Sequence, residues 1–371
     1  MSRSLAAAAA LAIFSCSAPS AAAPASPSPT QATAIAHASP SPQPSPPWQG
    51  PPCRLPAMLW SDIGQETQGG FIDAATGAFT PDPHSVMVHD SATGLTRTPD
   101  QPYLYSSGAG DFATAAATYD APQHRWLPVP RELVSPDGAS YAYDERQPGA
   151  TQGVHIVNVA TGADRVVPGT NGDPDPRGKH YGVVAYQPDG IYLNLVSQLG
   201  GIGLWLLNPD TSAITQVSTD APGVGVFVAG KQAWWTAPSA NPYASSDPFV
   251  THQYLTGAAG QHGETWFQRP GTGLHVLGVD ASGRAIVLAQ SASDEIWQLA
   301  IPNDSKTLRM MPNDPSFPQL VPFKTAVLDT AGWWIGSRTG VFLATSSGEF
   351  HQASTTPAVV AGAWEVSGAD R

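Results

Sequence analysis

The sequence is short of charge and of cysteine, and it holds a single long apolar run. Charged residues make up only 12% of the 371 residues, about half the usual share in soluble domains. Seventeen Lys and Arg stand against 29 Asp and Glu, which gives a net charge of −12. Because nucleic-acid binding requires a basic patch, this balance excludes that class of partner. The two cysteines, Cys16 and Cys53, do not form a disulfide framework.

Glycine and proline are abundant. The chain contains 36 Gly and 37 Pro, spread along its length, and 42% of its residues are hydrophobic. This composition is enough for a core and predicts many turns between short strands, as in an all-β protein.

The first 16 residues read as an export signal. Arg3 precedes an apolar run from Leu5 to Phe14, which is too short to span a bilayer and is typical of a signal peptide. Residues 13–16, Ile-Phe-Ser-Cys, resemble a bacterial lipobox, which implies lipidation of Cys16 and anchoring by the lipid alone. Cleavage after an Ala-rich site at residues 20–23 is the alternative, and it would discard Cys16.

Residues 17–52 consist almost wholly of Ala, Ser, Pro, Thr and Gln. Such a segment cannot bury a core, so we expect an extended, disordered tether. The sequence therefore predicts three parts: a signal peptide at 1–16, a tether at 17–52 and a folded body at 53–371.

The body repeats a pattern of four short strands. Residues 133–167 read as strand, Asp-Gly turn, strand, loop, strand, Thr-Gly turn and strand, with glycines supplying the positive φ of tight hairpins. Similar units follow at 183–217, 226–268, 275–310 and 326–352, and an upstream unit is expected at 86–129, with residues 86–89 as its first strand. Four strands in a unit of roughly 50 residues is typical of β-propeller blades.

The two ends of the body complement each other. Residues 58–80 match the last three strands of a unit, and residues 357–368 match a first strand. We therefore predict a ring closed by N-terminal strands at 57–80 and a C-terminal strand at 357–366. The prediction is a seven-bladed β-propeller, with six or eight blades as alternatives.

Two of the turns carry a family resemblance. Ser-Pro-Asp-Gly at 135–138 and Gln-Pro-Asp-Gly at 187–190, each followed by an apolar strand, resemble the repeats of TolB-like and WD-like propellers. The resemblance implies the fold and a role as an interaction platform, and it implies no chemistry.

Long polar loops are expected on the face opposite the tight strand 1–2 turns, where binding residues tend to lie. The candidate ligand-binding residues on that face are Asp144, Glu145, Arg146, Asp173, Asp175, Arg177, His180, Asp294, Glu295 and Arg338.

These residues allow several chemical interpretations. Asp173, Asp175 and His180 could bind Ca²⁺, but Asx turns capped by proline are the favoured explanation. Asp144 with Glu145, Asp294 with Glu295, or Asp62 with Glu66 could act as an acid–base pair on a polysaccharide. His252, His262 and Glu264 lack the spacing of a zinc site. The sequence predicts no catalytic residue and no cofactor, and it leaves the metal content open.

Two tryptophan pairs, Trp234-Trp235 and Trp333-Trp334, occupy equivalent second strands. One ring of each pair should point to either side of its blade. Packing between blades is favoured over stacking on sugars.

These features favour an exported, non-enzymatic binding platform for an envelope protein or a cell-wall glycan. The alternatives are an extracellular polysaccharide hydrolase or lyase that uses loop carboxylates, and a structural role in an envelope complex.

Overall fold

The structure is a computed structural model. It describes residues 53–59, 66–90, 95–98, 101–106, 117–145, 151–170, 180–197, 200–220, 227–238, 253–258, 262–268, 272–279, 284–291, 297–302, 307–310, 326–328, 332–337, 340–345, 350–362 and 365–366. The signal peptide and tether expected at 1–52 lie outside these ranges.

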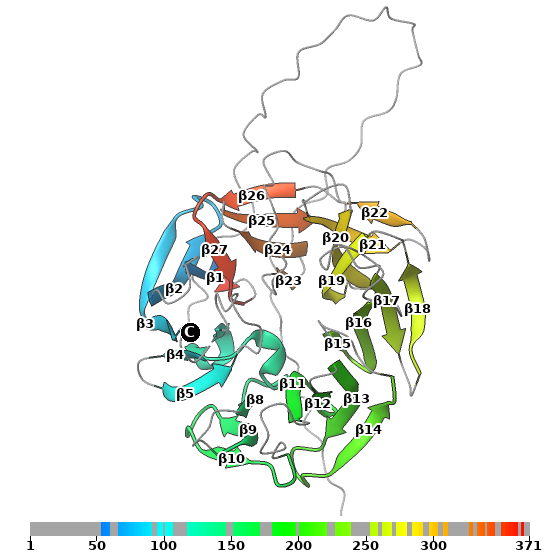
Figure 1. The fold of residues 1–371 in the computed structure, drawn as a ribbon. Coiled ribbons are helices and arrows are strands. Elements are labelled where there is room, and N and C mark those ends of the chain that lie inside the picture. The colour runs from blue at the N-terminus through cyan, green and yellow to red at the C-terminus, as the bar shows by residue number, and fades with distance from the viewer. Residues whose placement is uncertain are drawn as a thin grey trace, which may run out of the picture.

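Four consecutive blades, each of four antiparallel strands in sequence order, follow one another from residue 180 (Figure 1). The first blade contains β11 (His180–Gln187), β12 (Gly190–Ser197), β13 (Gly200–Leu207) and β14 (Ile214–Ser218). The second contains β15 (Phe227–Ala229), β16 (Gln232–Pro238), β17 (Gln253–Ala258) and β18 (Glu264–Gln268). The third contains β19 (Thr272–Val279), β20 (Ala285–Ser291), β21 (Trp297–Pro302) and β22 (Leu308–Met310). The fourth contains β23 (Ala326–Leu328), β24 (Gly332–Ser337), β25 (Gly340–Thr345) and β26 (Phe350–Ser354).

A fifth blade joins the two ends of the body. It is built from β27 (Ala358–Val360), β1 (Cys53–Leu59), β2 (Glu66–Asp73) and β3 (Phe79–Asp90), in that order. Ala57 pairs with Val360 and Leu59 with Ala358, and β28 (Glu365–Val366) adds a short pairing to the start of β1. The predicted closure of N-terminal strands on a C-terminal strand is confirmed.

The segment between β3 and β11 is less regular. The hairpin of β4 (Leu95–Thr98) and β5 (Gln101–Ser106) extends the sheet of the closing blade. A second hairpin pairs β6 (Thr118–Asp120) with β7 (Arg125–Leu127) around the short 3₁₀ helix η1 (Ala121–Gln123). After η2 (Arg131–Leu133), the strands β8 (Ser140–Glu145), β9 (Gly153–Asn158) and β10 (Asp164–Val166) form a three-stranded sheet.

One part of the predicted upstream unit is wrong. Residues 86–89 are not the first strand of a blade, because they belong to β3 and pair with β2: Val86 lies opposite Gln68 and Val88 opposite Glu66. The described residues establish an all-β propeller with five complete four-stranded blades, and they do not confirm the count of seven.

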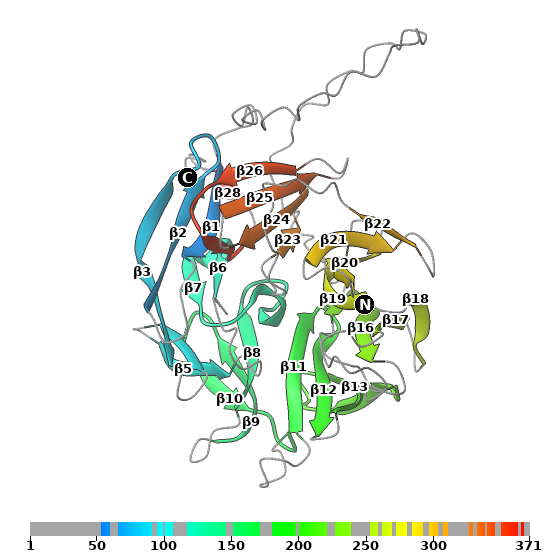
Figure 2. The same ribbon diagram turned by 45° about the horizontal axis from the view of Figure 1, so that its top comes forward.

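The blades surround a common centre, as the two views of the ribbon show (Figures 1 and 2). Apolar side chains fill the wedges between neighbouring blades. Trp235 packs with Tyr192 and Val228, whereas Trp234 packs with Phe267 and Val287 of the next wedge. Trp234, Trp235, Trp333 and Trp334 are all at most 7% exposed, so the prediction that they are core residues on opposite sides of a blade is confirmed.

Polar side chains also join several neighbouring sheets between β3 and β14. Arg125 Nη1 donates to the carbonyl oxygen of Val159, and Arg165 Nη1 donates to Ser212 Oγ at 3.2 Å. Trp126 Nε1 donates to Asp82 Oδ2 at 3.0 Å. The bonds of Arg125 and Trp126 are half-buried and help to fix the angle between adjacent sheets, whereas that of Arg165 is exposed. In the part of the chain that the structure describes, no helix has the length and apolar character needed to cross a membrane.

Candidate functional site

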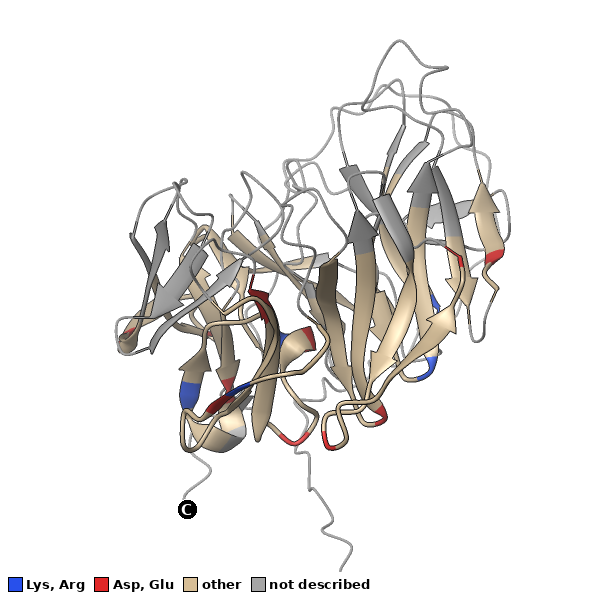
Figure 3. Ribbon diagram, turned by 60° about the horizontal axis from the view of Figure 1, so that its bottom comes forward, with Lys and Arg blue, Asp and Glu red and all other residues tan. Residues whose placement is uncertain are grey.

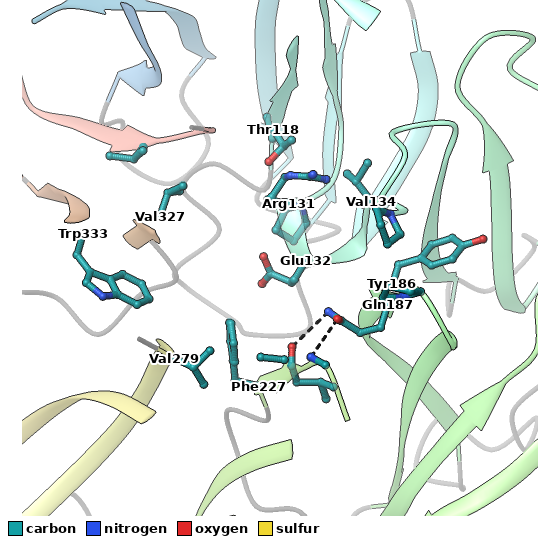
Figure 4. Close-up of a pocket in the computed structure, with 18 residues that line it drawn as sticks. Thr118, Arg131, Glu132, Val134, Tyr186, Gln187, Phe227, Val279, Val327 and Trp333 are labelled. Carbon is teal, nitrogen blue, oxygen red and sulfur yellow. Dashed lines mark hydrogen bonds between the residues drawn. The ribbon is translucent and has the colours of Figure 1, made fainter. Parts of the chain in front are cut away.

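A cavity of about 480 Å³ lies where the inner strands of the blades converge (Figure 4). Its volume falls in the range of small-ligand sites, roughly 300–1,000 Å³. Its walls come from β6, η2, β11, β15, β19, β23, β24 and β27, mostly at the ends of strands next to the tight strand 1–2 turns. The apolar wall residues include Val134, Phe227, Val279, Val327, Trp333 and Val360.

The charged residues of the cavity come from η2. This single 3₁₀ turn begins after Pro130, and Leu133 anchors it in the core with no exposed surface. Arg131 and Glu132 are therefore held at the cavity wall. In Figure 4 the carboxylate of Glu132 points into the space between η2 and Trp333, while the side chain of Arg131 runs towards Thr118.

A buried carboxylate lies behind Arg131. Asp120 is 4% exposed and its side chain lies against Gly138, where a Cβ would be only 2.9 Å from either carboxylate oxygen. Burial raises the pKa of Asp120, and the positive charges of Arg131 and Arg125 partly oppose that rise. Arg131 thus has an electrostatic counterpart within the protein.

An amide on β11 fixes the wall between two blades. Gln187 Nε2 donates to the carbonyl oxygen of Val228 at 3.3 Å, and its Oε1 accepts from the backbone N–H of Gly230 at 3.3 Å. Both halves of the amide are used (Figure 4). Since Phe227 precedes this contact on β15, the bridge also sets where its ring meets the cavity.

Aromatic rings line two sides of the cavity, with Trp333 on one and Phe227 on another. Trp333 lies against Gly278, where an added Cβ would be 2.4 Å from its Cη2 atom. Only a glycine at that position leaves room for the ring, so β19 positions Trp333 by the absence of a side chain.

The turns around the cavity carry several acidic side chains. Asp137 and Asp189 are exposed at such turns, and Asp210 is exposed at the turn between β13 and β14. Figure 3 shows acidic positions at several turns of the ribbon. Burial raises the pKa of the cavity residue Tyr186, and the charges of Asp137 and Asp210 raise it further against the opposing charge of Arg165. The electrostatic environment at this wall is therefore negative.

The structure places three of the sequence-predicted site residues. Asp144 and Glu145 end β8, and His180 begins β11. Asp144 is 4% exposed, and its Oδ1 accepts the backbone N–H of Val183 at 3.2 Å. This bond joins β8 to β11, so Asp144 has a structural role between two blades. The three residues lie outside the cavity lining.

The remaining predicted site residues lie outside the described residues. They are Cys16, Arg146, Asp173, Asp175, Arg177, Asp294, Glu295 and Arg338. Their assignment to a ligand site, and that of Cys16 to lipidation, stays a prediction.

The described ranges contain no group of three or more His, Cys, Asp or Glu side chains arranged to hold a metal ion. His262 instead lies 3.5 Å from Asp220 on the surface, and Glu264 is exposed on β18.

Sequence reasoning missed the cavity residues because their types are ordinary and they are far apart in the chain. Arg131 and Glu132 precede the Ser-Pro-Asp-Gly turn, and Gln187 opens the Gln-Pro-Asp-Gly turn. Their closeness to the predicted turns is the one local signal that could have pointed to them.

Comparisons with protein-family models and with curated proteins give no match. Among solved structures, the chain is similar to the periplasmic gluconolactonase PpgL of Pseudomonas aeruginosa, with a TM-score of 0.43, 17% identity, and coverage of 84% of this chain and 97% of that one. It is also similar to the β-propeller domain of the trilobed protease from Pyrococcus furiosus, with a TM-score of 0.38, 11% identity, and coverage of 80% and 84%.

A third similarity is to TolB of Acinetobacter baumannii, with a TM-score of 0.30, 9% identity, and coverage of 69% and 65%. The propeller fold that the turns implied is confirmed by the strand pairing of the described residues. With every TM-score below 0.5, these similarities assign no function to the chain.

Proposed function

We propose that this protein is an exported, lipid-anchored, seven-bladed propeller that binds a protein partner without catalysing a reaction. The leader at 1–16 and the tether at 17–52 support export and anchoring. The single structural observation that supports binding is the cavity of about 480 Å³ at the meeting point of the inner strands.

The composition of the walls favours a protein segment over a glycan. Apolar side chains of valine, alanine, proline, phenylalanine and tryptophan form most of the lining, and the charged groups are confined to η2. A sugar would bring hydroxyl groups that lose their hydrogen bonds to water against such walls, at a cost of about 1–3 kcal/mol for each unpaired group. An amino-acid side chain with an apolar stem and one polar tip fits this surface better.

The rigidity of the site supports the same role. The Gln187 bridge and the close contact of Trp333 with Gly278 hold the walls before any partner arrives. A preformed site avoids the entropic cost of ordering side chains on binding.

Affinity capture from the envelope extract of the host cell tests the proposal. The full chain is immobilised in three forms: wild type, the cavity-filling variant Ala229→Trp and the matched variant Ala213→Trp. Ala229 lines the cavity and Ala213 is exposed at the turn between β13 and β14.

We expect a protein that wild type and Ala213→Trp both retain and that Ala229→Trp loses. Retention of the same protein by all three forms would show that the cavity is not the binding site. Retention of a wall polysaccharide that is then released as cleaved product would contradict the non-enzymatic role and favour the hydrolase or lyase alternative.

A further inference from the structure

We infer that the cavity binds an alkylammonium group, the chemistry of a lysine side chain, as the recognised feature of the ligand. This inference rests on the proposed function and adds to it the class of ligand. The carboxylate of Glu132, the aromatic walls and the charges near Tyr186 support it.

Glu132 supplies the anionic partner. It lines the cavity, is half-buried, and points into the central space (Figure 4). A carboxylate accepts about four hydrogen bonds, so the interaction that Glu132 already makes leaves positions for an ammonium donor. Charge-assisted bonds of this kind are shorter and stronger than neutral ones, and apolar walls strengthen them by lowering the local dielectric constant.

The walls suit the rest of the ligand. Val279, Val327 and Phe227 present apolar surface on the sides away from η2. A four-carbon stem can lie along such surface while its charged tip reaches a polar group. The rings of Trp333 and Phe227 add cation–π attraction for a cation placed between them and Glu132.

Arg131, the cation of η2, does not oppose this arrangement. Its side chain runs towards Thr118 in Figure 4, away from the space that Glu132 enters. Its charge acts on the carboxyl of Asp120, whose pKa it lowers against the larger effect of burial. The positive charge of Arg131 is therefore offset within the protein.

The wall at Tyr186 has the complementary sign. Asp137 lies at a strand 1–2 turn and Asp210 at the turn between β13 and β14, and together their charges outweigh that of Arg165 at this wall. The negative environment is felt at Tyr186 on the wall. With a net charge of −12 on the whole chain, the approach of a cation is favoured.

Calorimetric titration of the full chain at pH 7 tests the inference with three probes of similar size: n-butylammonium, butan-1-ol and butyrate. We expect n-butylammonium to bind about tenfold more tightly than butan-1-ol, because only the cation gains the charge-assisted bond and the cation–π contact. Butyrate should bind most weakly. This comparison uses wild type alone and depends on no variant.

Glu132→Gln keeps the shape of the side chain and removes its charge, and Glu264→Gln does the same at an exposed position on β18. We expect Glu132→Gln to lose about tenfold in affinity for n-butylammonium with little change for butan-1-ol. Glu264→Gln should match wild type. If Glu132→Gln fails to fold, Phe227→Leu should reduce the preference for the cation over the alcohol severalfold.

A further titration separates two sources of the same chemistry. Binding of Nα-acetyl-lysine amide at least as tight as that of n-butylammonium would identify a lysine of a protein. Exclusion of the lysine derivative while n-butylammonium binds would identify a free small amine.

Equal binding of n-butylammonium and butan-1-ol, or unchanged binding by Glu132→Gln, would overturn the inference. Neither result would contradict the proposed binding role, which is tested separately by comparing the proteins that wild type and Ala229→Trp retain.

Discussion

The carboxylate of Asp120 is buried at the end of β6, and its Oδ2 atom has no hydrogen-bond partner among the described residues. A buried carboxylate oxygen without a hydrogen bond destabilises a fold unless the group takes up a proton. Burial accordingly raises its pKa above the ordinary value. At the scale of single residues, the Asp120 carboxyl group directly behind the cavity wall therefore lowers the free energy of unfolding.

Replacing this carboxyl group should stabilise the protein at neutral pH. Between the unfolded pKa of about 4 and the raised folded pKa, the folded state holds a proton that the unfolded state has lost. Wild-type stability therefore falls as pH rises through that window and stays lower above it. Asp120→Asn cannot ionise, so we expect its Tm to exceed that of wild type at pH 7 by more than at pH 3.

Thermal unfolding of both proteins across pH 3–8 measures this difference. A difference in Tm between the two proteins that does not change with pH would show that Asp120 has the same pKa in the folded and the unfolded state. A Tm of Asp120→Asn that falls further below that of wild type towards pH 7 would show that Arg131 and Arg125 hold the carboxylate in its charged form.

At the scale of elements, one turn recurs in three sheets: between β2 and β3, between β9 and β10, and between β13 and β14. Asn158 Oδ1 accepts from the backbone N–H and the hydroxyl of Thr161, both at 2.9 Å. Asp73 with Thr76 and Asn208 with Thr211 repeat the backbone bond. The residue after the threonine has positive φ in all three turns: Gly77 at 69°, Gly162 at 68° and Ser212 at 60°.

Ser212 is therefore the strained member of the set. A side chain costs free energy in the left-handed region that glycine enters freely. We expect Ser212→Gly to raise the free energy of unfolding by about 0.5 kcal/mol, less than the full relief of strain because Ser212 Oγ accepts from Arg165. Urea unfolding measures it.

The reverse substitution, Gly162→Ser, is the matched control and should lower stability. If the two substitutions change stability in the same direction, the shared turn geometry is not the cause.

These local signals explain how much of the fold the sequence could predict. Each of these turns is determined by Asx, threonine and glycine residues within a window of four positions. The sequence therefore predicts the strands that flank such turns, and their order, most completely for β8 to β14. Residues 86–89 were misplaced because their short apolar run, Val86 to Val88, suits either an inner or an outer strand. The pairing of Val86 with Gln68 is a contact that no local pattern specifies.

The candidate site was less predictable for the same reason. Glu132, Gln187 and Phe227 come from three separate elements and meet only when the ring forms. Loop composition drew attention to the opposite face, where Asp144 proves to accept a backbone bond from Val183. The other predicted loop residues remain untested.

At the scale of the whole molecule, the ring depends on β27. Ala358, Val359 and Val360 are at most 4% exposed and pair with β1, and Ala358 also pairs with Ser337 at the edge of the neighbouring blade. Without them β1 would present an unpaired edge, which invites association with other chains. Closure thus protects both the core and the solubility of the protein.

Deleting residues 358–371 should be far more damaging than deleting residues 363–371, which removes β28 and keeps β27. Burial of two valines contributes about 3–6 kcal/mol, so the longer deletion should lower the free energy of unfolding by at least about 3 kcal/mol. Urea unfolding and gel filtration give the comparison. Equal stability of the two truncated chains would show that β27 does not close the ring.

The most direct test of the central claim is photo-cross-linking in envelope extract. The photoreactive residue p-benzoylphenylalanine is placed at position 227 in the cavity, at position 145 at the end of β8, or at position 266 on the outer strand β18, each in the full chain. A partner bound in the cavity should form an adduct from position 227 and from neither of the others. Adducts from position 145 alone would place the partner on the face that loop composition predicted and would contradict the assignment of function to the cavity.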